Sequence, residues 1–120
     1  MSSHAYRLFA WAIENDAPLR CRYKGMPREF CPITLGTDEK GEVAHVWVTG
    51  GVASGPLPAW RTFRLENVTG TKPGEGEWQT GASKGGKAPT IAVDYDANRA
   101  SPYGPSHSLG ELRGEPPPEG

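Results

Sequence analysis

The spacing of apolar residues near the start of the chain predicts an amphipathic helix. Apolar side chains recur there at intervals of three and four residues, which places them on one face of a helix of about three turns. These side chains are Tyr6, Phe9, Ala10 and Ile13. Ser2 or Ser3 is suited to cap the first turn, and the Asn-Asp-Ala-Pro stretch at 15–18 ends the helix.

The next apolar and polar positions predict a β-hairpin. Residues 19–23 (Leu-Arg-Cys-Arg-Tyr) alternate strictly, with apolar side chains on one face and basic ones on the other, as in a half-buried strand. Glycine and proline chemistry makes residues 24–27 a turn. Residues 28–35 then return as a second strand, in which Pro32 favours an edge position or a bulge because it lacks an N–H.

Two more strands follow a polar turn at residues 36–41. Residues 43–48 (Val-Ala-His-Val-Trp-Val) are the best candidate for a buried strand. Residues 60–65 alternate again, and this alternation places Phe63 and Leu65 on the buried face. A helix with four or five short strands predicts a mainly β protein with one N-terminal helix, built as a small SH3-like or Sm-like barrel whose open end the helix covers.

Composition divides the chain near residue 69. Ten of the sixteen glycines and seven of the twelve prolines lie after it, and such a stretch cannot easily bury enough apolar surface to offset its chain entropy. We therefore expect a helix-plus-barrel domain at 1–69 and a flexible, largely disordered tail at 70–120. Residues 90–95 (Thr-Ile-Ala-Val-Asp-Tyr) are the one part of that tail suited to order, as a short edge strand or a docking segment.

Net charge, the first residues and the cysteines limit the binding partners and the cellular location that we expect. The net charge of −1 supplies no overall field toward nucleic acid or membranes, so binding of a polyanion requires a local patch. No secretory leader and no apolar run of membrane-spanning length are visible, which predicts a cytoplasmic protein with reduced thiols and no membrane partner. Cys21 and Cys31 have the same parity about the hairpin turn, which predicts small core residues that are cross-strand neighbours.

Basic side chains on the predicted strands are the main candidate for a binding site. Alternate residues of a strand share a face, so Arg20, Arg22 and Lys24 line one side. Further cations on the other strands are Arg28, Arg61 and Arg64. Guanidinium groups that converge on one site bind phosphate oxygens through pairs of parallel hydrogen bonds, a geometry that lysine does not match.

Aromatic residues beside these cations extend the same hypothesis. Tyr23, Trp47 and Trp60 are placed to stack on a base. The alternative is that the cations form the solvated outer face of a barrel. The carboxylates that would balance them there are Glu29, Glu42 and Glu66.

Motifs for catalysis or metal binding are not found in the sequence. Residues 81–88 fall short of a P-loop, because Ala88 stands where the magnesium ligand is needed and Pro89 obstructs the following helix. Histidines and cysteines lack the paired spacing of a zinc site, and His45 is expected to be a packed strand residue. Residues 51–55 lack the spacing of a nucleophile elbow. We therefore expect no enzyme activity, no cofactor and no metal.

Two longer stretches carry a family resemblance. Residues 19–32 read Leu-Arg-Cys-Arg-Tyr-x-Gly-x-x-Arg-x-x-x-Pro, and residues 60–68 read Trp-Arg-Thr-Phe-Arg-Leu-Glu-Asn-Val. Over roughly residues 5–69 the chain resembles a WYL domain, and its loop at 50–60 is similar to that of short stand-alone WYL-like bacterial proteins. The strand that reads Trp-Tyr-Leu in the family reads Trp-Val-Thr at 47–49 here.

The resemblance implies an Sm-like, SH3-type barrel that binds a ligand in transcription regulation, with a nucleotide or single-stranded nucleic acid as the usual suggestion. The second hypothesis is a protein–protein adaptor that binds a peptide through the aromatic and proline-rich loop at 50–60. The ligand-binding residues expected under the first hypothesis are Arg20, Arg22, Tyr23, Arg28, Trp47, Trp60, Arg61 and Arg64.

Overall fold

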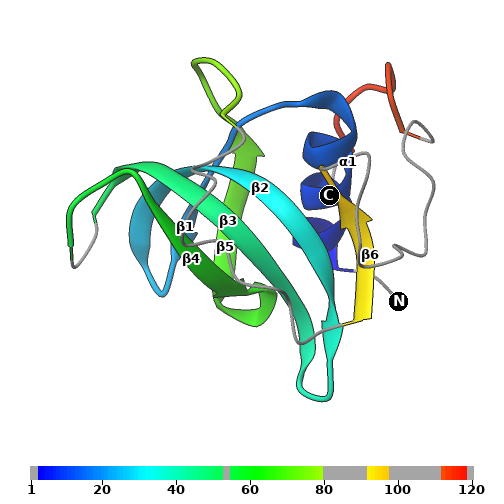
Figure 1. Cartoon of the computed structure of the whole chain (residues 1–120), viewed down its shortest axis with the longest axis horizontal. Helices are drawn as coiled ribbons and strands as arrows, with labels where there is room; N and C mark the ends of the chain where they lie inside the picture. Colours follow the sequence, from blue (N-terminus) through cyan, green and yellow to red (C-terminus); the bar gives the residue numbers. More distant parts are fainter. Residues whose placement is uncertain (1–2, 53–54, 80–91, 98–111, 119–120) are drawn as a thin grey trace.

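One helix and six strands make up the described part of the chain (Figure 1). The computed structural model describes residues 3–52, 55–79, 92–97 and 112–118. The elements are α1 His4–Asn15, β1 Leu19–Tyr23, β2 Met26–Asp38, β3 Gly41–Gly51, β4 Ala59–Arg64, η1 (a short 3-10 helix) Leu65–Asn67, β5 Val68–Pro73 and β6 Ala92–Asp96. The protein is therefore mainly β with one N-terminal helix, as the sequence predicts.

The six strands form one antiparallel sheet that curls on itself. Five strands follow the order β4-β3-β2-β1-β5, and β6 pairs with β2. On one edge of β2, β1 pairs with residues 26–30 and β6 pairs with residues 34–37. Two strands separate β1 from β4 in the sheet, yet Tyr23 of β1 stacks on Phe63 of β4 with ring centroids 4.2 Å apart. Such a contact requires strong bending of the sheet.

The sheet is bent but not closed. Among the described strands, β4 and β5 end the order without pairing with each other. A closed barrel is therefore not confirmed, although the strong bend that the sequence predicts is present. In Figure 1, α1 stands against the curled sheet.

Local sequence signals define α1 as predicted. The Ser3 hydroxyl accepts a hydrogen bond from the Tyr6 N–H at 3.0 Å, so Ser3 is the N-cap. Asp16 adopts a left-handed conformation at the C-cap and ends the helix. The apolar face of α1 packs on the sheet, where the ring of Phe9 lies 5.2 Å from that of Phe30.

The turn between β1 and β2 fixes the register of the predicted hairpin. Lys24 and Gly25 both have positive φ values, 52° and 83°, which suits a two-residue turn whose twist matches that of the flanking strands. This turn places Arg20 directly opposite Glu29.

Pro32 occupies a bulge inside the sheet. The pairing of β2 with β3 shifts register between Pro32 and Thr34. On the opposite edge, Pro32 lies between the residues that pair with β1 and those that pair with β6. The missing N–H therefore interrupts neither of these two ladders. Of the two predicted alternatives, the bulge is confirmed, and β2 is an interior strand.

Several strand ends differ from the sequence-based expectation, and those of β2 and β4 bear on the site and the core. β2 continues to Asp38, so the predicted turn at 36–41 shrinks to its middle residues. β4 ends at Arg64, and Leu65 begins the 3-10 helix. Phe63 and Leu65 are both buried as predicted, but only Phe63 is buried through strand alternation.

The sheet extends past residue 69, where composition places the end of the folded domain. β5 pairs with β1 up to Pro73, and Tyr95 of β6 is buried in the core. Of the two roles expected for residues 90–95, the strand is the one found, because β6 spans most of them. The parts of the expected flexible tail at 80–91 and 98–111 lie outside the described residues.

The last described segment contacts α1. Trp11 Nε1 donates to the backbone oxygen of Glu115 at 2.6 Å, and Asn15 donates to that of Leu112 at 3.0 Å. The N–H of Gly114 donates back to the Asn15 side chain at 2.7 Å. Helix α1 is thus held between the sheet and residues 112–115.

Candidate functional site

Three strands bring basic side chains together on the outer face of the sheet. Arg20 on β1 lies directly opposite Glu29 on β2 and Lys72 on β5. Opposed residues of antiparallel strands project to the same face about 5 Å apart. Arg22, two residues along β1, shares that face. All four side chains are exposed, so this row is charged surface.

A hollow of about 650 Å³ lies at this row, and we call it the basic hollow. Its volume falls in the range of small-molecule sites. Four of its lining side chains are cations and one is a carboxylate. The lining residues are Arg20, Cys21, Arg22, Pro27, Arg28, Glu29, Gly51, Gly70 and Lys72.

Two glycines allow the end of β3 to approach β2 at the basic hollow. Gly51 has a φ of +94°, and a Cβ there would come within 2.3 Å of the carbonyl oxygen of Pro27. A Cβ on Gly50 would come within 2.2 Å of Glu29 Oε2. Any larger residue at either position would therefore displace part of the wall.

The cations of the basic hollow have few protein partners. Among the described residues, no ion pair within 4.0 Å joins Arg20, Arg22, Arg28 or Lys72 to a carboxylate. Arg22 Nη1 donates to the carbonyl oxygen of Gly25 at 3.2 Å. The Nε of Arg28 is buried, and no described group accepts a hydrogen bond from it. Four cations near one carboxylate repel one another and attract an anion.

Cys21 lies in the wall of the basic hollow as a protonated thiol. Burial raises its pKa to about 12, and the nearby Arg28 offsets only part of that rise. A thiol with such a pKa is a poor nucleophile at neutral pH. The structure thus gives the basic hollow the means to bind an anion, while Cys21 acts as a small buried residue.

The two cysteines are free and buried, but they are not cross-strand neighbours. The hairpin turn is centred on Lys24 and Gly25, so Cys21 pairs with Arg28. Cys31 lies beyond the β1 ladder and pairs with Trp47 of β3 instead. The prediction failed because the turn is centred between Lys24 and Gly25, whereas Cys21 and Cys31 would lie opposite each other only in a turn centred on Met26.

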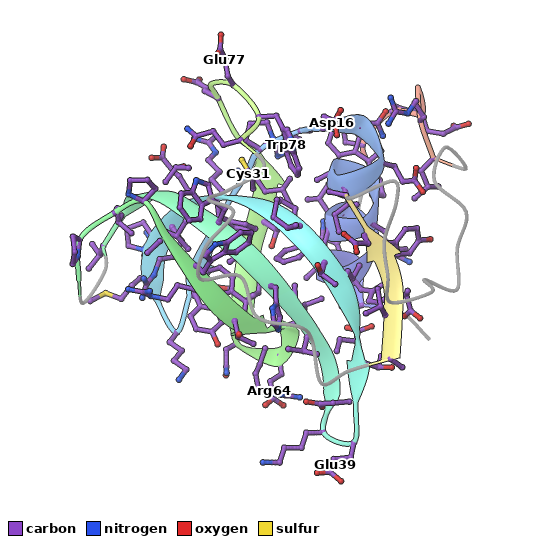
Figure 2. The ribbon with its side chains drawn as sticks, viewed as in Figure 1. Asp16, Cys31, Glu39, Arg64, Glu77 and Trp78 are labelled. Atoms are coloured by element: carbon purple, nitrogen blue, oxygen red, sulfur yellow. The ribbon has the colours of Figure 1, made fainter. Side chains whose placement is uncertain are left out.

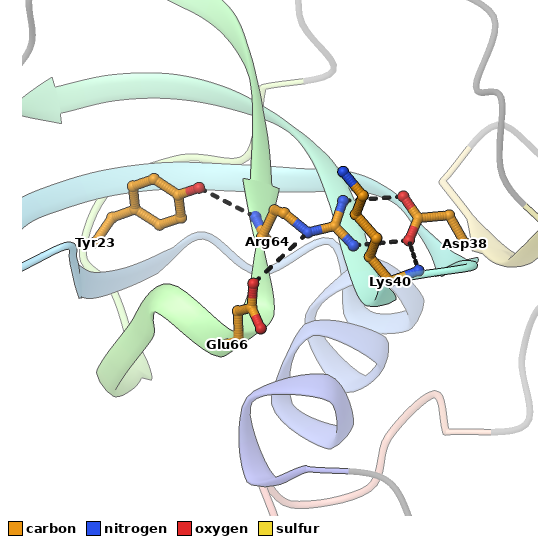
Figure 3. A network of polar contacts seen from close by, with 5 residues as sticks. All are labelled: Tyr23, Asp38, Lys40, Arg64 and Glu66. Carbon is orange, nitrogen blue, oxygen red and sulfur yellow. Dashed lines mark hydrogen bonds and ion pairs between the residues drawn. The ribbon is translucent and has the colours of Figure 1, made fainter.

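Arg64 lies outside the basic hollow and is paired (Figure 3). Its Nη atoms donate to the two carboxylate oxygens of Asp38 at 2.9 and 2.7 Å, and its Nε lies 4.0 Å from Glu66. These bonds from Arg64 lower the pKa of Asp38 to about 2. Figure 2 shows Arg64 at the end of the sheet from which the β2–β3 turn with Glu39 projects. The expected convergence of Arg64 with the arginines of β1 is therefore not found, because Asp38 binds its guanidinium.

The remaining predicted site residues also lie apart from the basic hollow. Tyr23 stacks on a core ring, and the buried Trp47 donates to Gln79 Oε1 at 3.0 Å. Trp60 meets Trp47 edge-on with centroids 5.2 Å apart, and Arg61 donates to the Trp60 carbonyl oxygen at 2.8 Å. Of the eight residues predicted as a ligand site, the structure brings three to the basic hollow. These are Arg20, Arg22 and Arg28.

Lys72 and Glu29 line the basic hollow but are not among the ligand residues predicted from the sequence. Lys72 lies in the segment that composition assigned to the tail. The sequence feature that favours a strand there is the stretch at 68–71 (Val-Thr-Gly-Thr), in which three of the four residues are β-branched. Glu29 was expected only to balance the charge of the cations, although the hairpin register places it opposite Arg20.

Other candidate chemistry finds no site in the described ranges. No group of three or more His, Cys, Asp or Glu side chains there is arranged to hold a metal ion. Burial lowers the pKa of His45, which favours its neutral form on β3. The P-loop-like stretch at 81–88 lies outside the described residues. No described helix has the length and apolar character needed to cross a membrane.

Comparisons of the chain with protein-family models, with curated proteins and with solved structures found no match. The resemblance to WYL domains therefore stays a prediction.

Proposed function

We propose that this protein is a non-catalytic regulatory domain that binds a phosphate-bearing ligand, a nucleotide or single-stranded nucleic acid, in the basic hollow. The observation that carries the proposal is the gathering of Arg20, Arg22, Arg28 and Lys72 around one hollow with a single carboxylate. Arginine side chains fork phosphate oxygens through parallel N–H bonds, and a lysine adds a compact charge. A bound phosphate relieves the mutual repulsion of these cations.

The contrast with Arg64 supports this proposal. Arg64 is half-buried and forms a two-bond pair with Asp38. Arg28 is also half-buried. The Nε of both arginines has no acceptor among the described groups, but Arg28 in addition has no described carboxylate that binds the rest of its guanidinium. A polar group removed from water without a partner is costly, and a phosphate oxygen in the basic hollow supplies the acceptor that Arg28 lacks.

Recognition in this proposal rests on the phosphate rather than on aromatic stacking. Trp47 and Trp60 pack against each other away from the basic hollow. The exposed apolar side chains near its rim are Met26, 47% exposed, and Val52, 46% exposed, each next to a lining residue. They offer apolar surface to the base or sugar of a ligand whose phosphate binds the cations.

The proposal also assigns the fold to the SH3-like and Sm-like barrels, in the form that WYL domains have. Two observations support this assignment. The sheet curls until Tyr23 of β1 meets Phe63 of β4, and α1 packs on the curled sheet. The proposed role in transcription regulation rests on the sequence resemblance alone.

Calorimetric titration of the full chain tests the function. Pyrophosphate, ADP and a single-stranded oligonucleotide are the probes, and affinity is expected to fall steeply with added salt. The double variant Arg20→Gln/Arg22→Gln is expected to bind at least about tenfold more weakly, because it removes charged hydrogen bonds. Arg7→Gln is the matched control, since Arg7 is an exposed arginine of α1 outside the basic hollow.

Two outcomes contradict the proposal. One is the absence of binding by the unaltered chain to all three probes at low salt. The other is an equal loss of affinity in the Arg7 control, which would indicate a diffuse charge effect rather than a site.

A protein–protein adaptor is the second candidate, and the position of β4 favours it. β4 ends the order of the described sheet, and its first residue, Ala59, directly follows Pro58 of the proline-rich stretch at 50–60. An edge strand offers backbone N–H and C=O groups to which an extended peptide adds. Peptide addition depends weakly on salt, whereas phosphate binding weakens steeply, so a salt series separates the two candidates.

A further inference from the structure

Glu29 places a hydrogen-bond acceptor in an otherwise cationic hollow. It lies opposite Arg20 across the β1–β2 ladder and opposite Gly50 across the β2–β3 ladder. Its Oε2 lies within 2.2 Å of the position that a Cβ on residue 50 would occupy. The carboxylate therefore folds over Gly50, toward β3 and away from the cations of β1 and β5.

This carboxylate has no protein partner among the described residues. No ion pair within 4.0 Å joins it to Arg20, although the two residues are directly opposed. The Thr49 hydroxyl donates to the backbone oxygen of Glu29 at 3.3 Å, and no described donor bonds to its side chain. Its full acceptor capacity thus remains available to a ligand.

Building on the function proposed above, we propose that Glu29 selects phosphate esters that carry a vicinal diol, with ribonucleotides as the chemical class. A ligand that offers only negative charge is repelled by this carboxylate. A pair of neighbouring hydroxyls instead donates to both of its oxygens, in charge-assisted hydrogen bonds. Carboxylates bind ribose hydroxyls in dinucleotide sites through the same chemistry.

The order of the strands places Lys72 farther from the acceptor than the arginines of β1. Neighbouring strands lie about 4.8 Å apart, so β3 under the carboxylate and β5 with Lys72 are separated by three spacings, about 14 Å. The arginines of β1 lie between them. An elongated ligand with its diol at one end and its phosphates at the other matches this layout. Glu29 then determines specificity, and the cations supply affinity.

Titration of the full chain with ADP, 2′,3′-dideoxy-ADP and pyrophosphate tests this inference. The unaltered chain is expected to bind ADP about tenfold more tightly than the dideoxy analogue, the effect of a hydrogen bond to a charged group. Glu29→Gln keeps the side-chain shape and is expected to abolish most of this preference, while binding pyrophosphate at least as tightly. Glu39→Gln, at an exposed glutamate of the β2–β3 turn, is the matched control and keeps the preference.

Gly50→Ala tests the position of the carboxylate rather than its charge. The added methyl group occupies the space of Glu29 Oε2, a movable side-chain end, so the carboxylate moves while the fold and the net charge stay. We expect this variant to lose the preference for ADP and to keep its affinity for pyrophosphate. Thermal unfolding of each variant checks that it is folded.

The outcomes separate this inference from the proposed function. If pyrophosphate binds but ADP and the dideoxy analogue bind equally, the role of Glu29 is wrong and the phosphate site stands. A preference that survives Glu29→Gln also overturns the role of Glu29. If neither pyrophosphate nor ADP binds the unaltered chain, both proposals fall.

Discussion

Phe63 holds the curl of the sheet, and its removal is the sharpest test of the fold. The side chain lies on β4, is 2% exposed, and stacks on Tyr23 of β1 with centroids 4.2 Å apart. It also meets Phe30 of β2 edge-on at 5.2 Å. One ring therefore joins three strands, two of which do not pair with β4.

Phe63→Ala is expected to lower the free energy of unfolding by about 3–5 kcal/mol, the range for a buried phenylalanine. Each of the two ring contacts contributes about 0.5–1.5 kcal/mol of such a loss beyond area burial. Because native proteins have only about 5–15 kcal/mol of stability in total, this loss removes a large part of the stability of so small a domain.

Urea denaturation followed by tryptophan fluorescence measures this loss, since the chain has four tryptophans. The midpoint is expected to fall while the slope of free energy against urea stays unchanged. Thr62→Ala changes the exposed neighbour of Phe63 and is expected to stay within about 0.5 kcal/mol of the unaltered protein. A loss below about 1 kcal/mol for Phe63→Ala would refute both the burial of the ring and the curl that depends on it.

Charge contacts and the last strand give three further expectations. Arg64 lowers the pKa of Asp38 from 3.8 to about 2. The ionised carboxylate of Asp38 therefore stabilises the folded state above about pH 5, and this contribution is lost as the pH falls from about 4 toward 2. Arg64→Gln is therefore expected to flatten the acid limb of a plot of Tm against pH, and an unchanged limb would contradict the pair. Arg20→Gln/Arg22→Gln is expected to leave the ligand-free protein as stable as before or slightly more stable in urea, and a loss above about 1 kcal/mol would mean that these arginines hold the fold. Truncation after Gln79 removes β6 with its buried Tyr95 and is expected to lower the Tm by several degrees. An unchanged Tm would instead support a folded domain that ends near residue 69.

The elements that sequence predicts well are those defined by neighbouring residues. The cap at Ser3 and the left-handed Asp16 delimit α1 through contacts within a few residues. The Lys24-Gly25 turn likewise fixes the hairpin through its own backbone. In each case the contact that determines the structure joins residues close together in the chain, so the local pattern of residue types is enough to predict it.

Two strands pair with partners far along the chain; the sequence missed β5 and gave β6 only as one of two roles for residues 90–95. β5 pairs with β1, and β6 pairs with the second half of β2. Glycine and proline content averaged over the C-terminal half predicted little order there, but a few β-branched and aromatic residues suffice where a sheet edge already exists. Val93 and Tyr95 are such residues, and both are buried. The amino-acid composition of a segment does not reveal a sheet edge that other strands form.

The same distinction explains the candidate site. Arg22 and Arg28 were expected to be close because one hairpin joins them, and both line the basic hollow. Arg64 was expected to join them through a long-range approach of β4 to β1. That approach occurs at the backbone, where the Arg64 N–H donates to the Tyr23 hydroxyl at 3.2 Å. The guanidinium nevertheless turns to Asp38, because β2 is longer than the sequence pattern indicated.

Residues of both parities line the basic hollow, and bulges occur in the ladders on both sides of it. In a regular strand Arg20 and Cys21 face opposite sides of the sheet, yet both belong to its wall. The β1–β5 ladder shifts register between Arg20 and Arg22, and the β2–β3 ladder shifts between Glu29 and Phe30. Each extra residue bends its strand and re-aims the side chains beside it. These two irregularities lie on either side of the regular β1–β2 ladder that carries Arg20, Arg22 and Glu29. Because bulge positions depend on pairing between strands, no single stretch of sequence predicts them.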